Sequence, residues 1–335
     1  MFALYVSHAE SGEITLFHLD PQRPALVPVQ TLAVGGEVMP MALSPDRTRL
    51  YAARRSQPRE ALSFGIDARS GRLQPLGAAA LPHSMANIAT DRTGRWLFSA
   101  SYGGDQVAVN AIDPEGIARA TQQVEATGRH AHAIHASPDN RFVYAATLGA
   151  GVLLRWNFDA ERGALAGPAT ALAPHADASP RHFVFSPDGR FAYLLNELDG
   201  VIDVLARDAA SGELAPVGSA SVLPPGFTGE PWAADLHLAP DGRFLYASER
   251  RSSTLSIFAV DAASGALSLR GQAATEAQPR GFGLTPDGRF LVAAGQQSHQ
   301  LSLYAVDAMQ GGLTLVDRCA TGRGPNWVES IALSI

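Results

Sequence analysis

The sequence predicts an all-β fold, a seven-bladed β-propeller, from a repeat period, strand-like alternation within each repeat and matching chain ends. A turn motif, SPDGR at residues 186–190, has counterparts that begin at positions 44, 90, 137, 239 and 285. The interval between successive turns is therefore 46 to 53 residues. A fixed period of this size is typical of propellers and other repeat folds.

Each repeat is expected to contain about four β-strands, the content of one propeller blade. A short apolar run follows the turn, for example FAYLL at residues 191–195. A second run, such as VIDVLARD at 201–208 or LSIFAVD at 255–261, alternates apolar and polar residues with the period of two that indicates a strand. Pro-Asp-Gly and Ser-Gly pairs separate the runs and favour tight turns.

The two chain ends supply the seventh blade. IALS at residues 331–334 is similar to MALS at 41–44, which leads into the first turn. FALYVS at residues 2–7 is similar to the strands that follow a turn. Pairing of these two segments in one composite blade would close the ring and leave no exposed sheet edge.

Composition narrows the classes of function. The 335 residues show no linker or low-complexity segment, so we expect a single domain over 1–335. A net charge of −6 argues against a nucleic-acid partner. Cys319 is the only cysteine, which excludes a disulfide framework. The N-terminus has no signal peptide or membrane span, so we expect a cytoplasmic protein, a monomer or a homodimer, without membrane contact. Nucleotide-binding fingerprints and a nucleophile elbow are absent, and no cofactor is expected.

Charged residues gather at one mouth of the expected central channel. The innermost strand of a blade begins at the face where the second strand ends, so two positions of each repeat meet there. Five residues before the turn, these positions hold His132, Arg181, Arg280 and Glu329, and eleven residues after it they hold Glu197, Arg250 and Gln296. Such charges are uncommon in strand-rich cores. They can satisfy one another in a polar channel, but several arginines around one cavity also suit a small anionic ligand.

Three further features are less specific. Asp235 lies on an entry strand, where it can orient an arginine, bond a ligand hydroxyl or bond the backbone. His130 and His132 belong to a histidine-rich segment, but no carboxylate run accompanies them, so we expect no metal. Residues 223–232 lengthen one interval and form either a lid or a simple insertion.

The chain resembles the bacterial 6-phosphogluconolactonases of the seven-bladed propeller lactonase family, which also contains carboxy-muconate lactonizing enzymes. The resemblance covers the full length, and its motifs are Pro180–Leu198, Trp232–Arg250, Gln278–Phe282, Ala294–His299 and Gly324–Trp327. It implies a hydrolase of 6-phospho-D-glucono-1,5-lactone in the pentose phosphate pathway. By the motifs of the lactonizing relatives, it also implies a functional group of His132, Glu197, Arg181 and Arg250. Glu329 stands where the family has an apolar residue, so the resemblance assigns it no role.

Ring opening by water needs a base, donors for the oxyanion and an acid for the ring oxygen. We expect Glu197 to be the base and His132 the acid, or the reverse, with Arg181 and Arg250 stabilising the oxyanion. Arg280 is the candidate for the substrate phosphate, and Asp235, Gln296 and Ser298 are further substrate-binding candidates. Replacing Glu197 by Gln is expected to lower the rate and to leave thermal stability nearly unchanged.

Three other functions are compatible with the sequence. The substrate can be another lactone, either an unphosphorylated sugar lactone or one derived from an aromatic acid. A non-catalytic scaffold is a different class, since many propellers bind partners without chemistry. A calcium-dependent propeller lactonase is the third, which a chelator would inactivate.

Overall fold

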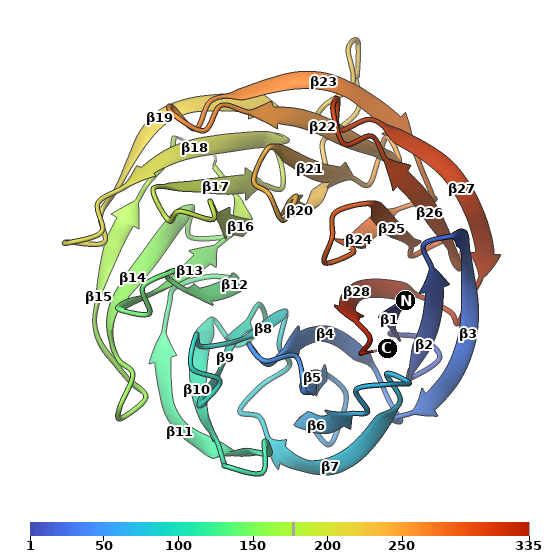
Figure 1. Cartoon of the computed structure of the whole chain (residues 1–335). Helices are drawn as coiled ribbons and strands as arrows, with labels where there is room; N and C mark the ends of the chain where they lie inside the picture. The colour runs from blue at the N-terminus through green and yellow to red at the C-terminus, as the bar shows by residue number, and fades with distance from the viewer. Residues whose placement is uncertain (176–177, 335) are drawn as a thin grey trace.

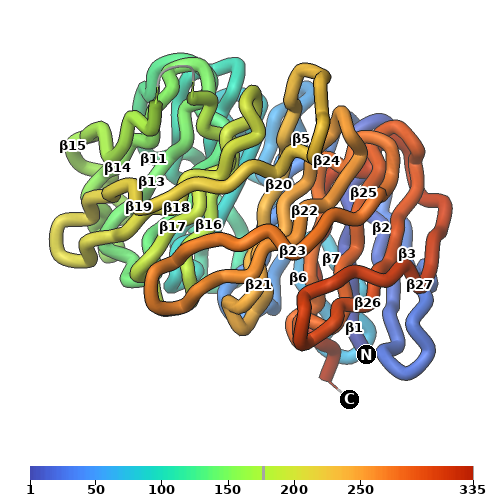
Figure 2. The backbone as a smooth tube through the Cα atoms, turned by 90° about the horizontal axis from the view of Figure 1, so that it is seen from above, coloured from blue at the N-terminus to red at the C-terminus, as the bar shows by residue number. Residues whose placement is uncertain are grey.

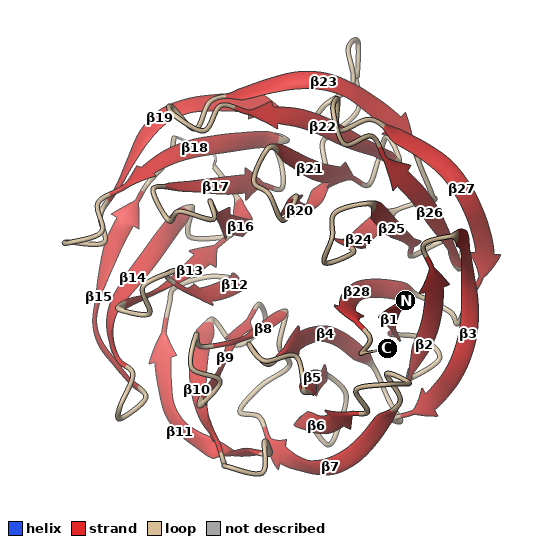
Figure 3. Ribbon diagram, viewed as in Figure 1, coloured by secondary structure: helices blue, strands red, loops and turns tan. Residues whose placement is uncertain are grey.

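The computed structural model describes residues 1–175 and 178–334 and confirms the seven-bladed propeller. Seven antiparallel sheets of four strands surround a central channel, with the first strand of each blade innermost (Figure 1). Strands and loops make up the described residues (Figure 3), and no helix among them is long and apolar enough to span a membrane. The expectation of a single domain over 1–335 stays a prediction, and residues 176, 177 and 335 lie outside the described part.

The blades are numbered here in chain order, each from its inner to its outer strand. Blade 1 contains β4 (Val38–Leu43), β5 (Arg49–Arg54), β6 (Glu60–Ile66) and β7 (Leu73–Ala80). Blade 2 contains β8 (Asn87–Thr90), β9 (Trp96–Ser101), β10 (Gln106–Ile112) and β11 (Ala118–Ala126). Blade 3 contains β12 (Ala131–Ala136), β13 (Phe142–Thr147), β14 (Val152–Asp159) and β15 (Ala164–Leu172).

Blades 4 to 6 repeat this order. Blade 4 contains β16 (Pro180–Phe185), β17 (Phe191–Asn196), β18 (Val201–Arg207) and β19 (Leu214–Ser221). Blade 5 contains β20 (Ala233–Leu238), β21 (Phe244–Glu249), β22 (Thr254–Val260) and β23 (Leu267–Ala274). Blade 6 contains β24 (Pro279–Leu284), β25 (Phe290–Gly295), β26 (Gln300–Val306) and β27 (Leu313–Ala320).

Blade 7 is the expected composite blade. It contains β28 (Pro325–Ala332), β1 (Phe2–His8), β2 (Glu13–Asp20) and β3 (Arg23–Ala33). β28 pairs antiparallel with β1, from Phe2 opposite Ala332 to Ser7 opposite Trp327. The two termini consequently lie together at one face of the ring (Figure 2). The ring is therefore closed by hydrogen bonds between the two ends of the chain.

The core lies between the facing sheets of neighbouring blades. Between blades 2 and 3, for example, Phe98, Val107, Val143 and Trp156 are fully buried in one apolar cluster. Equivalent clusters join the other neighbours around the ring. This packing holds the innermost strands in fixed positions around the channel.

A tyrosine that recurs in the second strand ties several blades together. The hydroxyl of Tyr246 donates to the carbonyl oxygen of Gly311 in the outer hairpin of the next blade, at 2.9 Å. Tyr5, Tyr51 and Tyr144 make the same kind of bond. The hydroxyl of Tyr193 is equally buried but has no partner among the described residues.

This difference gives a matched stability prediction. Tyr246→Phe is expected to lower the free energy of unfolding by about 1 kcal/mol, because the Gly311 carbonyl loses its donor. Tyr193→Phe removes an unpaired buried hydroxyl and is expected to be neutral or slightly stabilising. Denaturant titrations of both variants would measure the two effects, and equal losses would contradict a contribution from the hydrogen bond.

The innermost strands share a β-bulge near their first residues. In β12 the pairing with β13 skips His132, in β16 it skips Arg181, and in β24 it skips Arg280. A bulged residue is released from the ladder, and the strand bends so that its side chain can be redirected. The bulge residues are the same residues that the sequence pattern placed at the mouth of the channel.

Candidate active site

A cavity of about 580 Å³ opens at the mouth of the channel where the innermost strands begin. Charged, polar and aromatic side chains from all seven blades line it, and they include His132, Glu197, Arg250, Arg280, Gln296, Arg55, Glu37, Tyr102, Trp232 and Glu10. The structure thus brings together five of the residues singled out in the sequence. Arg181 lies directly behind this lining, with an exposed fraction of 1%.

Glu197 is held between two buried guanidinium groups. Its Oε2 accepts from Arg181 Nε at 2.7 Å, and its Oε1 lies 3.1 Å from Arg250 Nη2. The indole nitrogen of Trp232 donates to Oε1 as well, at 2.9 Å. Burial opposes ionisation of Glu197, but the charges of Arg181 and Arg250 outweigh it and lower the pKa of the carboxyl. Glu197 is therefore an anion with most of its lone pairs engaged.

Arg250 is fixed by contacts on several sides. Its guanidinium carbon lies 3.7 Å from the ring centre of Trp232, a cation–π contact. Its Nε and Nη2 donate to the carbonyl oxygens of Trp232 and Ala233, at 3.0 and 3.1 Å. Burial and the nearby Arg181 lower the pKa of Arg250 to about 8. A positioned donor of this kind suits a developing oxyanion, because it needs no reorganisation during the reaction.

His132 is a buried imidazole at the edge of the cavity. Only 4% of it is exposed, and its Nδ1 is buried without a partner among the described residues. The ring of Tyr102 meets it edge-on, with centroids 6.1 Å apart. Burial, followed by the charge of Arg181, holds the pKa of the His132 imidazole well below its usual value. His132 is therefore neutral near pH 7 and able to accept a proton.

Arg280 lines the cavity as a cation without a direct ion-pair partner among the described residues. No hydrogen bond or ion pair joins its guanidinium to any residue of the described ranges, although Arg181 and Arg250 are both bound to Glu197. Burial and the charges of Arg181 and Arg55 lower its pKa to about 9, so Arg280 is still largely protonated near pH 7. Arg280 is half-buried, and a guanidinium without an ion-pair partner at such a position is suited to bind a ligand anion.

The remaining candidates differ in where they lie. Gln296 lines the cavity, whereas Ser298 is not part of the lining and its hydroxyl donates to the Gly295 carbonyl at 3.4 Å. Trp232 ends the extended connection 223–232 and was missed, because the repeat pattern gives no signal inside an insertion. Tyr102 and Arg55 also line this cavity, and neither was among the residues predicted for the site.

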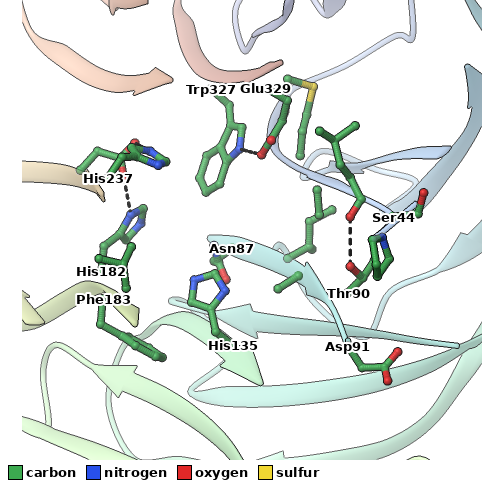
Figure 4. Close-up of a pocket in the computed structure, with 18 of the residues that line it drawn as sticks. Ser44, Asn87, Thr90, Asp91, His135, His182, Phe183, His237, Trp327 and Glu329 are labelled. Atoms are coloured by element: carbon green, nitrogen blue, oxygen red, sulfur yellow. Dashed lines mark hydrogen bonds and ion pairs between the residues drawn. The ribbon is translucent and has the colours of Figure 1, made fainter. Parts of the chain in front are cut away.

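Asp235 and Glu329 lie in a different cavity, of about 520 Å³, at the mouth where the innermost strands end (Figure 4). Asp235 Oδ1 accepts from His182 Nδ1 at 2.8 Å, and its Oδ2 accepts from His237 Nε2 at 3.1 Å. Glu329 accepts from the indole nitrogen of Trp327 at 3.0 Å, and burial raises the pKa of Glu329 to about 6. Asp235 therefore does not line the cavity that holds Arg280.

The position of Glu329 corrects the repeat alignment of the composite blade. Glu329 pairs with Tyr5, as Ala42 pairs with Tyr51, so Asn326 takes the place expected for Glu329. Asn326 is also the residue that the pairing of β28 with β1 skips. The alignment of residues 331–334 with 41–44 was wrong by three residues. No connecting turn joins β28 to β1, so nothing in the local sequence fixed their register.

Metal binding has no support in the part of the chain that the structure describes. There, no group of three or more His, Cys, Asp or Glu side chains is arranged to hold a metal ion. His130 has a positive φ of 63°, and its ring stacks on Tyr102 with centroids 4.1 Å apart.

Comparison with known proteins adds independent information. The family model for the seven-bladed β-propeller lactonase matches residues 3–330. Proteins named 6-phosphogluconolactonase are 41% identical in Pectobacterium carotovorum and 38% identical in Serratia proteamaculans, each covering 98% of both chains. The solved structure of a periplasmic gluconolactonase from Pseudomonas aeruginosa superposes with a TM-score of 0.91 at 28% identity, over 99% of both chains.

Proposed function

The chain belongs to the seven-bladed β-propeller lactonase family, and from this premise we propose that it hydrolyses 6-phospho-D-glucono-1,5-lactone to 6-phosphogluconate, a step of the pentose phosphate pathway. It is a lactone hydrolase, because full-length relatives at about 40% identity carry that activity in their names. The cavity with His132 and Arg280 is the proposed site.

The observation that carries the substrate assignment is the unpaired guanidinium of Arg280. Arg181 and Arg250 share the Glu197 carboxylate, and Arg280, on which Glu197 acts only at longer range, has no ion-pair partner of its own among the described residues. A phosphate monoester presents several anionic oxygens and matches the planar donor array of Arg. Gln296, in the same lining, is placed to contact sugar hydroxyls. Asp235 and Ser298 fall outside this substrate site.

The site geometry favours His132 over Glu197 as the general base. Both carboxylate oxygens of Glu197 already meet donors from Arg181, Arg250 and Trp232, which leaves no free acceptor position for the proton of a water. The neutral imidazole of His132 keeps a lone pair free, and its lowered pKa leaves it deprotonated at neutral pH. Glu197 then holds Arg250 in place through their ion pair, and buried Arg181 positions Glu197 by donating to its Oε2.

The reaction follows from these roles. Water attacks the carbonyl carbon of the lactone while His132 takes a proton from it. Arg250 donates to the oxyanion of the tetrahedral intermediate. The bond from the carbonyl carbon to the ring oxygen then breaks, and the His132 imidazolium returns the proton to that oxygen. The new carboxylic acid loses its own proton to solvent, so one proton is released per turnover.

The test compares two substrates with one variant. For Arg280→Ala, kcat/KM on freshly prepared 6-phosphogluconolactone is expected to fall about 10- to 150-fold, the cost of a hydrogen bond to a charged group. On unphosphorylated glucono-1,5-lactone the same variant is expected to stay within about threefold, because no phosphate contact is lost. Rates must be corrected for spontaneous hydrolysis.

The matched control is Arg251→Ala. Arg251 is exposed, its guanidinium carbon lies 4.9 Å from the ring centre of Trp232, and it is not part of the cavity lining. It should leave both rates unchanged. A wild-type enzyme that prefers glucono-1,5-lactone, with Arg280→Ala affecting both substrates equally, would refute the phosphate assignment. That result would place the chain with the gluconolactonase that it resembles in structure.

The cellular setting belongs to the same proposal. We propose a cytoplasmic enzyme, monomeric or homodimeric, because a phosphorylated sugar lactone is produced and consumed inside the cell. Cell fractionation and light scattering would check location and mass. Recovery in a periplasmic extract would contradict the location.

A further inference from the structure

A line of buried polar side chains connects the two cavities. The imidazole rings of His132 and His182 lie with centroids 5.1 Å apart. His182 Nδ1 is 2.8 Å from Asp235 Oδ1, and Asp235 Oδ2 is 3.1 Å from His237 Nε2. His132, His182 and Asp235 are exposed by 4%, 7% and 6%. The line therefore runs from the proposed base to the opposite mouth of the channel.

Asp235 determines which nitrogen of His182 carries the proton. The carboxylate is ionised, because His237 and His182 outweigh the cost of its burial and lower its pKa. A carboxylate only accepts hydrogen bonds, so His182 Nδ1 must be the donor. Burial lowers the pKa of His182 to about 4, so the ring is neutral and its Nε2 holds a lone pair. The backbone amide of Leu236 also donates to Asp235 Oδ1, at 3.0 Å, and fixes the carboxylate.

His132 and His182 each have one buried nitrogen without a partner. These are His132 Nδ1 and His182 Nε2. An in-line N–H···N bond of about 3 Å between two imidazoles places their ring centres about 5 Å apart, close to the separation observed. The two nitrogens do not bond each other as the rings stand, and a rotation of the His132 ring would direct its Nδ1 at His182 Nε2.

We propose that His182, held by Asp235, is the positioning residue of the base, and that it keeps His132 in the tautomer protonated on Nδ1. The lone pair of His132 then resides on Nε2, which is free to take the proton of the attacking water. During turnover the His132 imidazolium donates Nδ1–H to His182 Nε2, which stabilises the charged intermediate. This inference rests on the proposed function, because it assigns a partner to the proposed base.

The surrounding charges explain why such a partner is needed. Arginine guanidiniums dominate the environment of His132, and a second positive charge there is unfavourable unless an acceptor meets it. The titratable and charged groups that act on the two rings are Arg181, Arg250, Arg280, His135 and Asp235, and the ring of Tyr102 contacts His132.

The first measurement is a two-bond ¹H–¹⁵N NMR spectrum of the wild-type protein, which distinguishes the tautomers of neutral histidines. His132 should appear as the Nδ1–H form and His182 as the Nδ1–H form. His132→Gln and His182→Phe provide the assignments. An Nε2–H form of His132 in the wild type would overturn the proposal, whatever the activity of the enzyme.

Kinetics of His182→Phe give the second measurement. Phe keeps a ring against His132 but cannot accept a hydrogen bond. We expect kcat to fall about 10- to 100-fold with KM within about twofold, and the Nε2–H form of His132 to appear. Asp235→Asn should weaken the hydrogen bond that orients His182. It should therefore lower kcat and increase the Nε2–H form of His132, both by less than His182→Phe does.

Asp203→Asn is the matched control. Asp203 is a buried carboxylate that accepts from Asn196 Nδ2 at 2.8 Å and contacts neither histidine. It should leave the His132 tautomer and kcat unchanged. If His132→Gln loses activity but His182→Phe does not, the positioning role is wrong and the proposed base stands. If His132→Gln retains full activity, the proposed function of the site itself fails.

Discussion

Replacing His132 by Gln is expected to lower kcat on 6-phosphogluconolactone by about 10²- to 10⁴-fold, the range for loss of a general base. Gln preserves hydrogen bonding but cannot take a proton from water. The wild-type rate should be flat from pH 6 to 7, because the pKa of His132 lies well below its usual value and Arg250, with a pKa of about 8, is still mostly protonated. The rate should fall only when the pH approaches that lowered pKa and the base becomes protonated. Steady-state rates above the spontaneous background would measure both effects.

His130→Asn is the control for this result. His130 is two residues away and stacks on Tyr102, but its backbone φ of 63° belongs to the left-handed region. Asn adopts that region readily, so the local backbone should be preserved. The variant should keep activity within about threefold. Equal losses in His130→Asn and His132→Gln would remove His132 as the base.

Replacing Glu197 by Gln is expected to destabilise the protein by about 3 kcal/mol, because it leaves two buried guanidiniums without a counter-charge. The side chains of Arg181 and Arg250 are exposed by only 1% and 2%, and Glu197 by 14%. This revises the expectation from the sequence that stability would be nearly unchanged. The pH dependence of stability has the same origin, because the pKa of Glu197 is lower in the folded protein than in the unfolded chain. The contribution of Glu197 to the free energy of unfolding is therefore complete above the pKa of the unfolded chain. It is lost as the pH falls through the lower pKa of the folded protein. Denaturant titration at pH 7 and at acid pH would test both statements.

Asp241→Asn separates this effect from that of an ordinary ion pair. Asp241 Oδ2 lies 2.7 Å from Arg243 Nε, but the two side chains are exposed by 47% and 54%. Exposed pairs contribute at most about 1 kcal/mol. A similar loss in both variants would show that Glu197 is not a buried counter-ion.

The fold could be predicted because the same turn motif recurs along the sequence. Each repeat carries the same turn residues, so weak local signals reinforce one another over the whole chain. The positions of His132, Arg181 and Arg280 could be predicted by the same count, because a turn begins five residues after each of them in the sequence. Counting works wherever a covalent turn joins two strands.

The site was less predictable where pairing is not local. Glu329 was misplaced because β28 and β1 meet without a turn between them. Asp235 follows Ala234 within a bulge that skips both residues, so simple alternation could not give its direction. The ionisation of Glu197 depends on two arginines from different blades, and sequence spacing cannot show that both reach one carboxylate.

Closure of the ring by β28 makes the last blade depend on segments from both ends of the chain. Ala9 and Glu10, next to β1, line the proposed active site, and Trp327 and Glu329 on β28 line the opposite cavity. A nascent chain has no finished blade 7 until residues 325–332 have left the ribosome. Prematurely terminated products that lack this segment would therefore carry every residue assigned to the reaction and still leave the channel wall incomplete.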